Sequence, residues 1–272
     1  MIEAVLAGLF GMLIGSFLNV CIYRLPRDLS VVHPRSHCVA CERTVAWHDN
    51  IPVISYLMLG GKCRWCQSPY SIAYPIVEFV TGLLFFVSVL SSGPNALGWK
   101  LCVFSAIMVD LTVTDLFDRI LPDEFTIGGF LAALLFAPFT PPPSNFSTLL
   151  LPATVAPWIH SVTETLIGGL TSAGVLWLTG EIYLRLRKRE GLGLGDVKMM
   201  LVVGGFLGLP GALMTVFAGS VLGAVIGGLY MMLSKKDELY ELPFGSFLGL
   251  AAVIIALFGD RIGAWYLGLL TA

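Results

Sequence analysis

The sequence is short of charged residues, which account for only 12% of its 272 positions. Soluble domains carry about 25%, so this chain lacks the charge to cover a water-facing surface, which excludes a soluble globular protein. Hydrophobic residues make up 56% instead. The first apolar stretch, residues 2–22, also lacks a preceding basic residue and a small-residue cleavage site. We therefore interpret it as a retained helix and not as a cleaved signal peptide.

Apolar windows recur along the chain, each about long enough to cross a bilayer. They predict an all-α polytopic membrane protein with about eight transmembrane helices. The windows are residues 2–23, 74–92, 97–114, 124–140, 160–183, 197–209, 211–233 and 244–270. A Gly-Leu-Pro-Gly sequence at 208–211 predicts a tight turn between the sixth and the seventh. The expected domains are the first helix (1–23), a loop module (24–73) and a seven-helix membrane domain (74–272).

The positive charges predict the orientation. With the N-terminus outside, all but two of the 16 Lys and Arg residues lie on the inner side, the exceptions being Lys100 and Arg261. Loops facing the cytoplasm carry an excess of these residues, so this topology is favoured. Residues 24–73 then form a cytoplasmic loop, and residues 139–159, rich in Pro and Ser, form an outer loop.

Four cysteines in the first loop form two Cys-x-x-Cys pairs, Cys38 with Cys41 and Cys63 with Cys66. This spacing is typical of a tetrahedral zinc site. A loop of this length buries little apolar surface, so a metal would stabilise its fold. Cytoplasmic thiols stay reduced, which argues against two disulfides. We predict a small zinc-ribbon-like module with a structural Zn²⁺, and redox-active pairs or incidental cysteines are the alternatives.

An aspartate at the mouth of an apolar segment is the first candidate for chemistry. Asp196 follows the glycine pair of Gly193-Leu194-Gly195, and ionisable side chains at such depths are costly and usually functional. The alternative interpretation is a helix N-cap, a role that suits Asp. The glycines at 191, 193 and 195 do not have the spacing of a dinucleotide loop and follow no predicted strand. No nucleic-acid partner is expected.

A second acid would complete an aspartyl protease. The candidates are Asp110, Asp115, Asp118 and Asp123, near the end of the third apolar window. We favour Asp115 and interpret Asp118 and Asp123 as part of a solvated turn. An acid at a helix C-terminus meets the negative end of the helix dipole, which favours its protonation. The hypothesis is that Asp115 carries the proton and that Asp196 is the charged base.

Other residues near these acids are predicted to support the site. Gly193 and Gly195 allow close backbone approach, as an extended peptide substrate requires, and Lys198 follows them. Glu78 either pairs with a cation such as Lys198 or Arg24 or contacts substrate. The acidic run at 237–241 is either a solvated loop or a receiver for a basic peptide.

Several motifs together resemble the prepilin peptidases, or type IV leader peptidases, a family of GxGD-type aspartyl membrane proteases. The resemblance spans nearly the whole chain, with the motifs in family order. They are Gly15-Ser16-Phe17-Leu18-Asn19-Val20, the two Cys-x-x-Cys pairs, Tyr74-Pro75-Ile76-Val77-Glu78, Asp115-x6-Pro122-Asp123, Gly193-Leu194-Gly195-Asp196-Val197-Lys198 and Pro243-Phe244-Gly245. The sequence departs from the pattern at Val39, where members often have Pro.

The resemblance implies a multi-pass enzyme of the bacterial inner membrane with its active site facing the cytoplasm. Such enzymes cut the basic leader from prepilins and pseudopilins after a Gly, and Asp115 and Asp196 match their two catalytic acids. Water activated by these acids would attack the scissile carbonyl. Many members also N-methylate the new N-terminal residue with S-adenosylmethionine, an activity tied to the cysteine loop. Substrate and membrane lipid are the expected partners.

Two other classes of function stay open from the residues alone. A proton-coupled membrane transporter could use Asp115, Asp196 and Glu78 as a proton path, although transport sites typically lie near the bilayer midplane. A non-catalytic assembly factor could use the zinc-ribbon module to dock a partner. Loss of leader cleavage on substitution of either aspartate distinguishes the protease from both.

Overall fold

The computed structural model describes residues 1–189, 191–234 and 243–270, and within these ranges the chain is helical. The only β-pairing there consists of two isolated bridges, His37 with Thr44 and Lys62 with Pro69. The α-helices are α1 (Ile2–Arg24), α2 (Ile54–Met58), α3 (Ala73–Ser92), α4 (Ala96–Asp118), α5 (Asp123–Phe136), α6 (Pro157–Arg187), α7 (Leu194–Leu222), α8 (Gly228–Ser234) and α9 (Phe244–Leu270).

The predicted apolar windows coincide with these helices. Four helical stretches in the described ranges are long and apolar enough to cross a membrane: Ile2–Arg27, Ala73–Ser92, Ala96–Asp118 and Leu194–Tyr230. The all-α membrane protein predicted from the sequence is confirmed to that extent. The number of eight crossings stays a prediction.

The predicted turn at 208–211 is a kink inside α7. Gly208 has φ 70° and ψ 178°, which is not helical, and Pro210 follows. Glycine adopts such a positive φ without the steric cost that a side chain brings. The sixth and seventh windows therefore lie on one interrupted helix.

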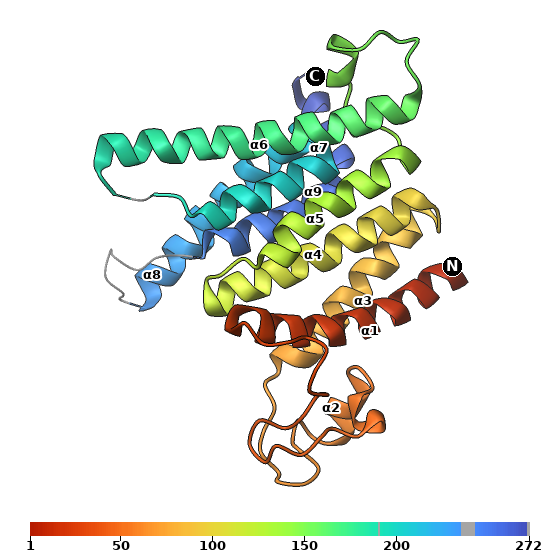
Figure 1. Cartoon of the computed structure of the whole chain (residues 1–272), viewed down its shortest axis with the longest axis vertical. Coiled ribbons are helices and arrows are strands. Elements are labelled where there is room, and N and C mark those ends of the chain that lie inside the picture. Colours follow the sequence, from red (N-terminus) through yellow and green to blue (C-terminus); the bar gives the residue numbers. More distant parts are fainter. Residues whose placement is uncertain (190, 235–242, 271–272) are drawn as a thin grey trace. The chain divides into compact units, whose positions relative to one another are not determined.

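The chain divides into two compact units, Met1–Asp110 and Leu111–Ala272, with the boundary inside α4. In the first unit α1 packs along α3. The connection between these two helices contains α2 and extends beyond their ends as a separate module (Figure 1). The Arg24 guanidinium starts this module by donating to the carbonyls of Ser30, at 2.8 Å, and Pro34, at 2.7 Å.

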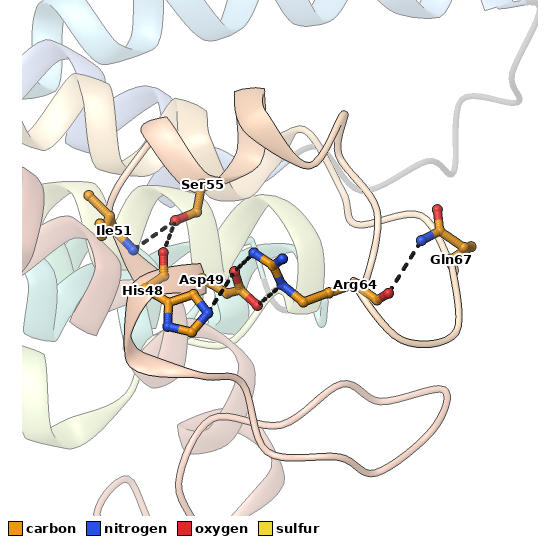
Figure 2. Close-up of polar contacts among 6 residues, drawn as sticks. All are labelled: His48, Asp49, Ile51, Ser55, Arg64 and Gln67. Carbon is orange, nitrogen blue, oxygen red and sulfur yellow. Dashed lines mark hydrogen bonds and ion pairs between the residues drawn. The ribbon is translucent and has the colours of Figure 1, made fainter.

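A cluster of polar contacts holds the later part of the module together (Figure 2). Arg64 donates to both carboxylate oxygens of Asp49, at 2.8 Å from Nε and 2.5 Å from Nη2. These hydrogen bonds hold the pKa of Asp49 below its usual value. The Ser55 hydroxyl donates to the carbonyl of His48 and accepts the N–H of Ile51. The segment before α2 is thereby tied to the second cysteine pair.

The second unit is centred on α7, which packs against α5, α6 and α9. Side chains on α7 such as Met199, Met200 and Val203 are fully buried. A Cβ on Gly204 would collide with the carbonyl of Gly168 on α6, and the reverse holds for Gly168. The two backbones are in direct contact, as small residues at a helix crossing permit.

The loop between α5 and α6 folds onto α6. Its anchor is Glu164, whose side chain is buried and accepts hydrogen bonds from the Ser144 hydroxyl and the Ser147 N–H. The Ser147 hydroxyl also contacts Nδ1 of His160, at 3.0 Å. This Pro- and Ser-rich loop is therefore an ordered cap on the helices of the second unit.

Candidate functional site

Asp115 lies in the last turn of α4 and is buried. Its Oδ2 accepts two hydrogen bonds from Ser246, one from the backbone N–H at 2.6 Å and one from the hydroxyl at 2.9 Å. Ser246 is in the first turn of α9, where backbone N–H groups have no partner within the helix. The carboxylate thus occupies the N-terminal end of a helix that is far away in the sequence.

Asp196 lies in the first turn of α7. The residue that caps this helix is Gly193, with an extended backbone and no capping side chain. The alternative interpretation of Asp196 as an N-cap is therefore wrong. Its place in the first turn still puts its negative charge at the positive end of the helix dipole.

The two carboxylates flank the same point of α9. A Cβ built on Gly245 would lie 3.1 Å from Oδ2 of Asp115 and 3.1 Å from Oδ1 of Asp196. Two oxygens that are both this close to one point are at most twice that distance apart. Asp115 and Asp196, separated in sequence by about half of the second unit, are therefore neighbours in space, and a side chain at position 245 would crowd both carboxylates.

The glycines and the lysine predicted to support the site have identifiable neighbours. A Cβ on Gly195 would lie 3.0 Å from the Leu121 side chain. Leu121, in the loop after α4, therefore fills the space beside this glycine. Lys198 donates to Oδ1 of Asp123 at 2.6 Å, and both side chains are largely exposed. This ion pair ties the start of α5 to the start of α7.

Glu78 belongs to the first unit. Its Oε2 accepts the backbone N–H of Val53 at 2.7 Å, which fastens the module to α3. The cations considered as its partners have other contacts, because Arg24 binds two carbonyls of the module and Lys198 pairs with Asp123. The acidic run at 237–241 lies outside the described residues.

The four cysteines of the first unit converge. The Sγ atoms of Cys38, Cys41, Cys63 and Cys66 all lie within 4.8 Å of one another, and those of Cys38 and Cys66 are 3.7 Å apart. A zinc ion with four Zn–S bonds of about 2.3 Å gives S–S distances of about 3.8 Å. The cluster therefore fits a tetrahedral metal ion.

Each cysteine pair is held in the same kind of turn. The N–H of Glu42 donates to the carbonyl of Cys38, and the N–H of Gln67 donates to that of Cys63. The N–H of Cys66 hydrogen-bonds the Cys63 sulfur and, against the effect of burial, lowers the pKa of Cys63 to about 6. Against the hydrogen bond from the Ser68 N–H, burial and the neighbouring thiols raise the pKa of Cys66 to about 11. Binding of a metal by all four sulfurs would therefore release a proton from Cys66.

Ser246 and Gly245 contact the acids, and neither was singled out for such a role from the sequence. Gly245 belongs to the Pro243-Phe244-Gly245 motif, which was used only as evidence of the resemblance to the family. Nothing in the local sequence of Ser246 links it to Asp115, because 131 positions separate the two residues. A polar residue directly after a motif at the start of an apolar helix was the available signal.

Comparisons with known proteins cover nearly the whole chain. Residues 9–92 match the "Bacterial Peptidase A24 N-terminal domain" and residues 102–228 match the "Type IV leader peptidase family". A protein of Aeromonas hydrophila named "Prepilin leader peptidase/N-methyltransferase" is 32% identical over 95% of this chain and 92% of its own. One of Xanthomonas campestris with the same name is 31% identical, covering 96% and 93%.

A third relative carries a different name. The "Type 4 prepilin-like proteins leader peptide-processing enzyme" of Escherichia coli O78:H11 is 34% identical over 92% of this chain and 91% of its own. No solved structure matches the chain. The matched regions include both aspartates and all four cysteines of the cluster. The chain belongs to the type IV leader peptidase family.

Proposed function

We propose that this chain cuts the leader from prepilins or pseudopilins and N-methylates the residue exposed by the cut. The observation that carries the proteolytic part is the approach of Asp115 and Asp196 on either side of Gly245. The relatives named above are peptidases and methyltransferases of prepilins, which favours this function over a transporter or a non-catalytic assembly factor.

The two acids supply general acid and base catalysis. One ionised carboxylate takes a proton from a water molecule as the water attacks the scissile carbonyl, and the protonated partner donates to the carbonyl oxygen. Two neighbouring carboxylates disfavour each other's ionisation, which favours one protonated and one ionised acid in the pair. The N-terminal turns of α7 and α9 surround the site with N–H donors and the positive ends of two dipoles.

The location of the shared proton involves opposing influences. The C-terminal end of α4 disfavours charge on Asp115, whereas the two donors of Ser246 stabilise it. A coupled pair titrates as a unit. We therefore assign the proton to the pair. The hypothesis drawn from the sequence had assigned it to Asp115.

The tetracysteine cluster is proposed to hold a structural Zn²⁺. Four thiolates complete the coordination shell and leave no position for a reacting water. S-adenosylmethionine, when bound, supplies a methyl group on a sulfonium sulfur for transfer to the new N-terminal amine. The role of this chain is to bind that donor and hold the amine beside it.

We propose that the enzyme lies in the bacterial inner membrane with its N-terminus outside and the acids facing the cytoplasm. The distribution of Lys and Arg along the chain supports this orientation. A protease-sensitive tag placed before Met1 tests this orientation. Protease added to intact spheroplasts should remove the tag. Removal only after the membrane is opened would reverse the topology.

The function is tested with the purified chain in phospholipid vesicles, S-adenosylmethionine as the methyl donor, and a prepilin whose leader ends in Gly. Mass spectrometry should detect both leader removal and methylation of the new N-terminus. Asp115→Asn and Asp196→Asn should each lower the rate of cleavage by about 10²–10⁴-fold. Glu124→Gln, which changes an exposed acid in the first turn of α5, is the control and should cleave normally. Normal cleavage by either aspartate variant would refute the two-acid mechanism.

A further inference from the structure

A cavity of about 400 Å³ lies between α1 and the loop that follows this helix. Leu13, Phe17 and Val20 line it from α1, and so does Arg24, the last residue of the helix. The 11 positions from Leu13 to Arg24 correspond to about 16 Å of helix, roughly half the thickness of the hydrocarbon core of a bilayer. The cavity therefore follows one flank of a candidate membrane span from its end to its middle.

The loop opposite α1 brings apolar side chains to the same space. Val31, Val32 and Pro34 line the cavity, and Val32 is 70% exposed. The Arg24 guanidinium holds this loop in place through its hydrogen bonds to the carbonyls of Ser30 and Pro34. The Ser30 hydroxyl in turn accepts the N–H of Val32. An ordered loop that exposes valine side chains is unfavourable in water and favourable against acyl chains.

Amphipathic and charged side chains complete the lining. Trp47 contributes an indole that is 76% exposed, and Trp is enriched where a membrane meets water. Arg35 contributes an exposed guanidinium that forms no ion pair with any residue described by the structure. The surrounding segment, residues 24–73, contains six basic and three acidic residues. A ligand in this cavity thus meets an apolar wall and a positively charged rim.

We infer that this cavity binds one anionic phospholipid from the leaflet on the module's side of the membrane. One acyl chain would lie against Leu13, Phe17 and the loop valines. The phosphate would accept hydrogen bonds from Arg35, with the indole of Trp47 at the level of the headgroup. Basic pockets beside membrane helices are known to bind such headgroups.

The lipid would link the module to the bilayer, because its headgroup contacts the loop and its acyl chain contacts α1. The lining includes neither the paired aspartates nor any of the clustered cysteines. The site is therefore separate from the proposed proteolytic and metal sites, and its existence does not depend on either of them.

Lipid retention tests the inference without measuring turnover. The purified full chain in detergent is mixed with equal amounts of phosphatidylglycerol and phosphatidylcholine, and native mass spectrometry counts the lipids that stay bound. One phosphatidylglycerol should be retained in preference to phosphatidylcholine. Arg35→Gln removes the guanidinium and should weaken this retention about tenfold. Arg43→Gln removes an exposed arginine of the same module outside the cavity and should leave retention unchanged.

A second pair of variants tests the part of the cavity that would hold the acyl chain. Leu13→Trp should fill this part and prevent retention. Leu9→Trp changes a similarly exposed leucine, one turn earlier on α1 and outside the cavity, and should bind normally. Circular dichroism should show the same helix content in both variants, which separates loss of the lipid from loss of the fold.

Photochemical cross-linking locates the lipid independently. Phosphatidylglycerol with a diazirine on its acyl chain should label peptides that contain residues 13–20 or 31–35, and an excess of unlabelled phosphatidylglycerol should suppress the labelling. Equal retention of the two lipids would overturn the inference. Unchanged retention in both Arg35→Gln and Leu13→Trp, or labelling confined to the second unit, would also overturn it.

Discussion

At the scale of single residues, the site depends on contacts between positions far apart in the sequence. The glycine-flanked Asp196 could be identified as functional from its local motif, and Asp115 from its place at the end of an apolar window. Their contact through Gly245 and the two hydrogen bonds from Ser246 could not, because they depend on how α4, α7 and α9 pack. Periodicity along one helix carries no information about such contacts.

Ser246 is expected to position Asp115 for cleavage. Ser246→Ala removes the hydroxyl donor and keeps the backbone N–H. Hydrogen bonds to charged groups contribute about 1.5–3 kcal/mol, so kcat for leader cleavage should fall about tenfold or more while KM stays nearly unchanged. Ser246→Thr, which restores a hydroxyl, should recover most of the rate. An unchanged kcat in Ser246→Ala would exclude this role.

Gly245 is expected to tolerate no side chain. Gly245→Ala would place a methyl group 3.1 Å from both carboxylates, which is too close for either to keep its position. Cleavage should be lost in a chain that still inserts and folds. Gly263→Ala on the same helix is the matched control, because its Cβ would meet no atom within 4 Å. Equal activity of the two variants would show that the acids do not meet at α9.

At the scale of elements, the length of the apolar segments predicted the helices, and a glycine-containing sequence predicted the interruption of one of them. The windows coincide with α1 and α3–α9, and the Gly-Leu-Pro-Gly sequence marks the kink of α7. Residues 139–159 were predicted only to form an outer loop rich in Pro and Ser, and Glu164 holds this loop against α6. A buried acid in a helix gives no sequence signal about the loop that it binds, so this cap could not be predicted.

The stability of the second unit is expected to depend on the close crossing of α6 and α7. Gly168→Ala adds a methyl group that collides with the carbonyl of Gly204. Overpacking of this kind typically costs 1–3 kcal/mol, and the free energy of unfolding in detergent should fall by about that amount. Gly174→Ala on the same helix meets no atom within 4 Å and should not destabilise the chain. A stable Gly168→Ala variant would contradict the close contact of the two backbones.

At the scale of the whole molecule, the paired acids and the cysteine cluster belong to different compact units. The acids lie within Leu111–Ala272, whereas the cysteine cluster lies within Met1–Asp110. The cysteine spacing was sufficient to predict that the four thiols form a cluster, because each pair is a local turn.

Loss of the metal is expected to separate the activities. Cys63→Ser removes one of the four thiolates and should release zinc, measured by metal analysis of the purified chain. Methylation should then fall sharply, because the resemblance to the family ties this activity to the cysteine loop. Leader cleavage should persist. Asp196→Asn should lose cleavage but still methylate a pilin that has already been cut, because that substrate supplies the free N-terminal amine. Equal loss of both activities in Cys63→Ser would contradict their separation.

The most direct test of the central claim is a double-mutant cycle on leader cleavage. If Asp115 and Asp196 activate one water together, each Asn variant alone should lower kcat by about 10²–10⁴-fold. The double variant should then be no slower than the single ones, because residues that act as a unit are not additive. Independent, multiplying losses, or a single variant with near-normal kcat, would contradict the account.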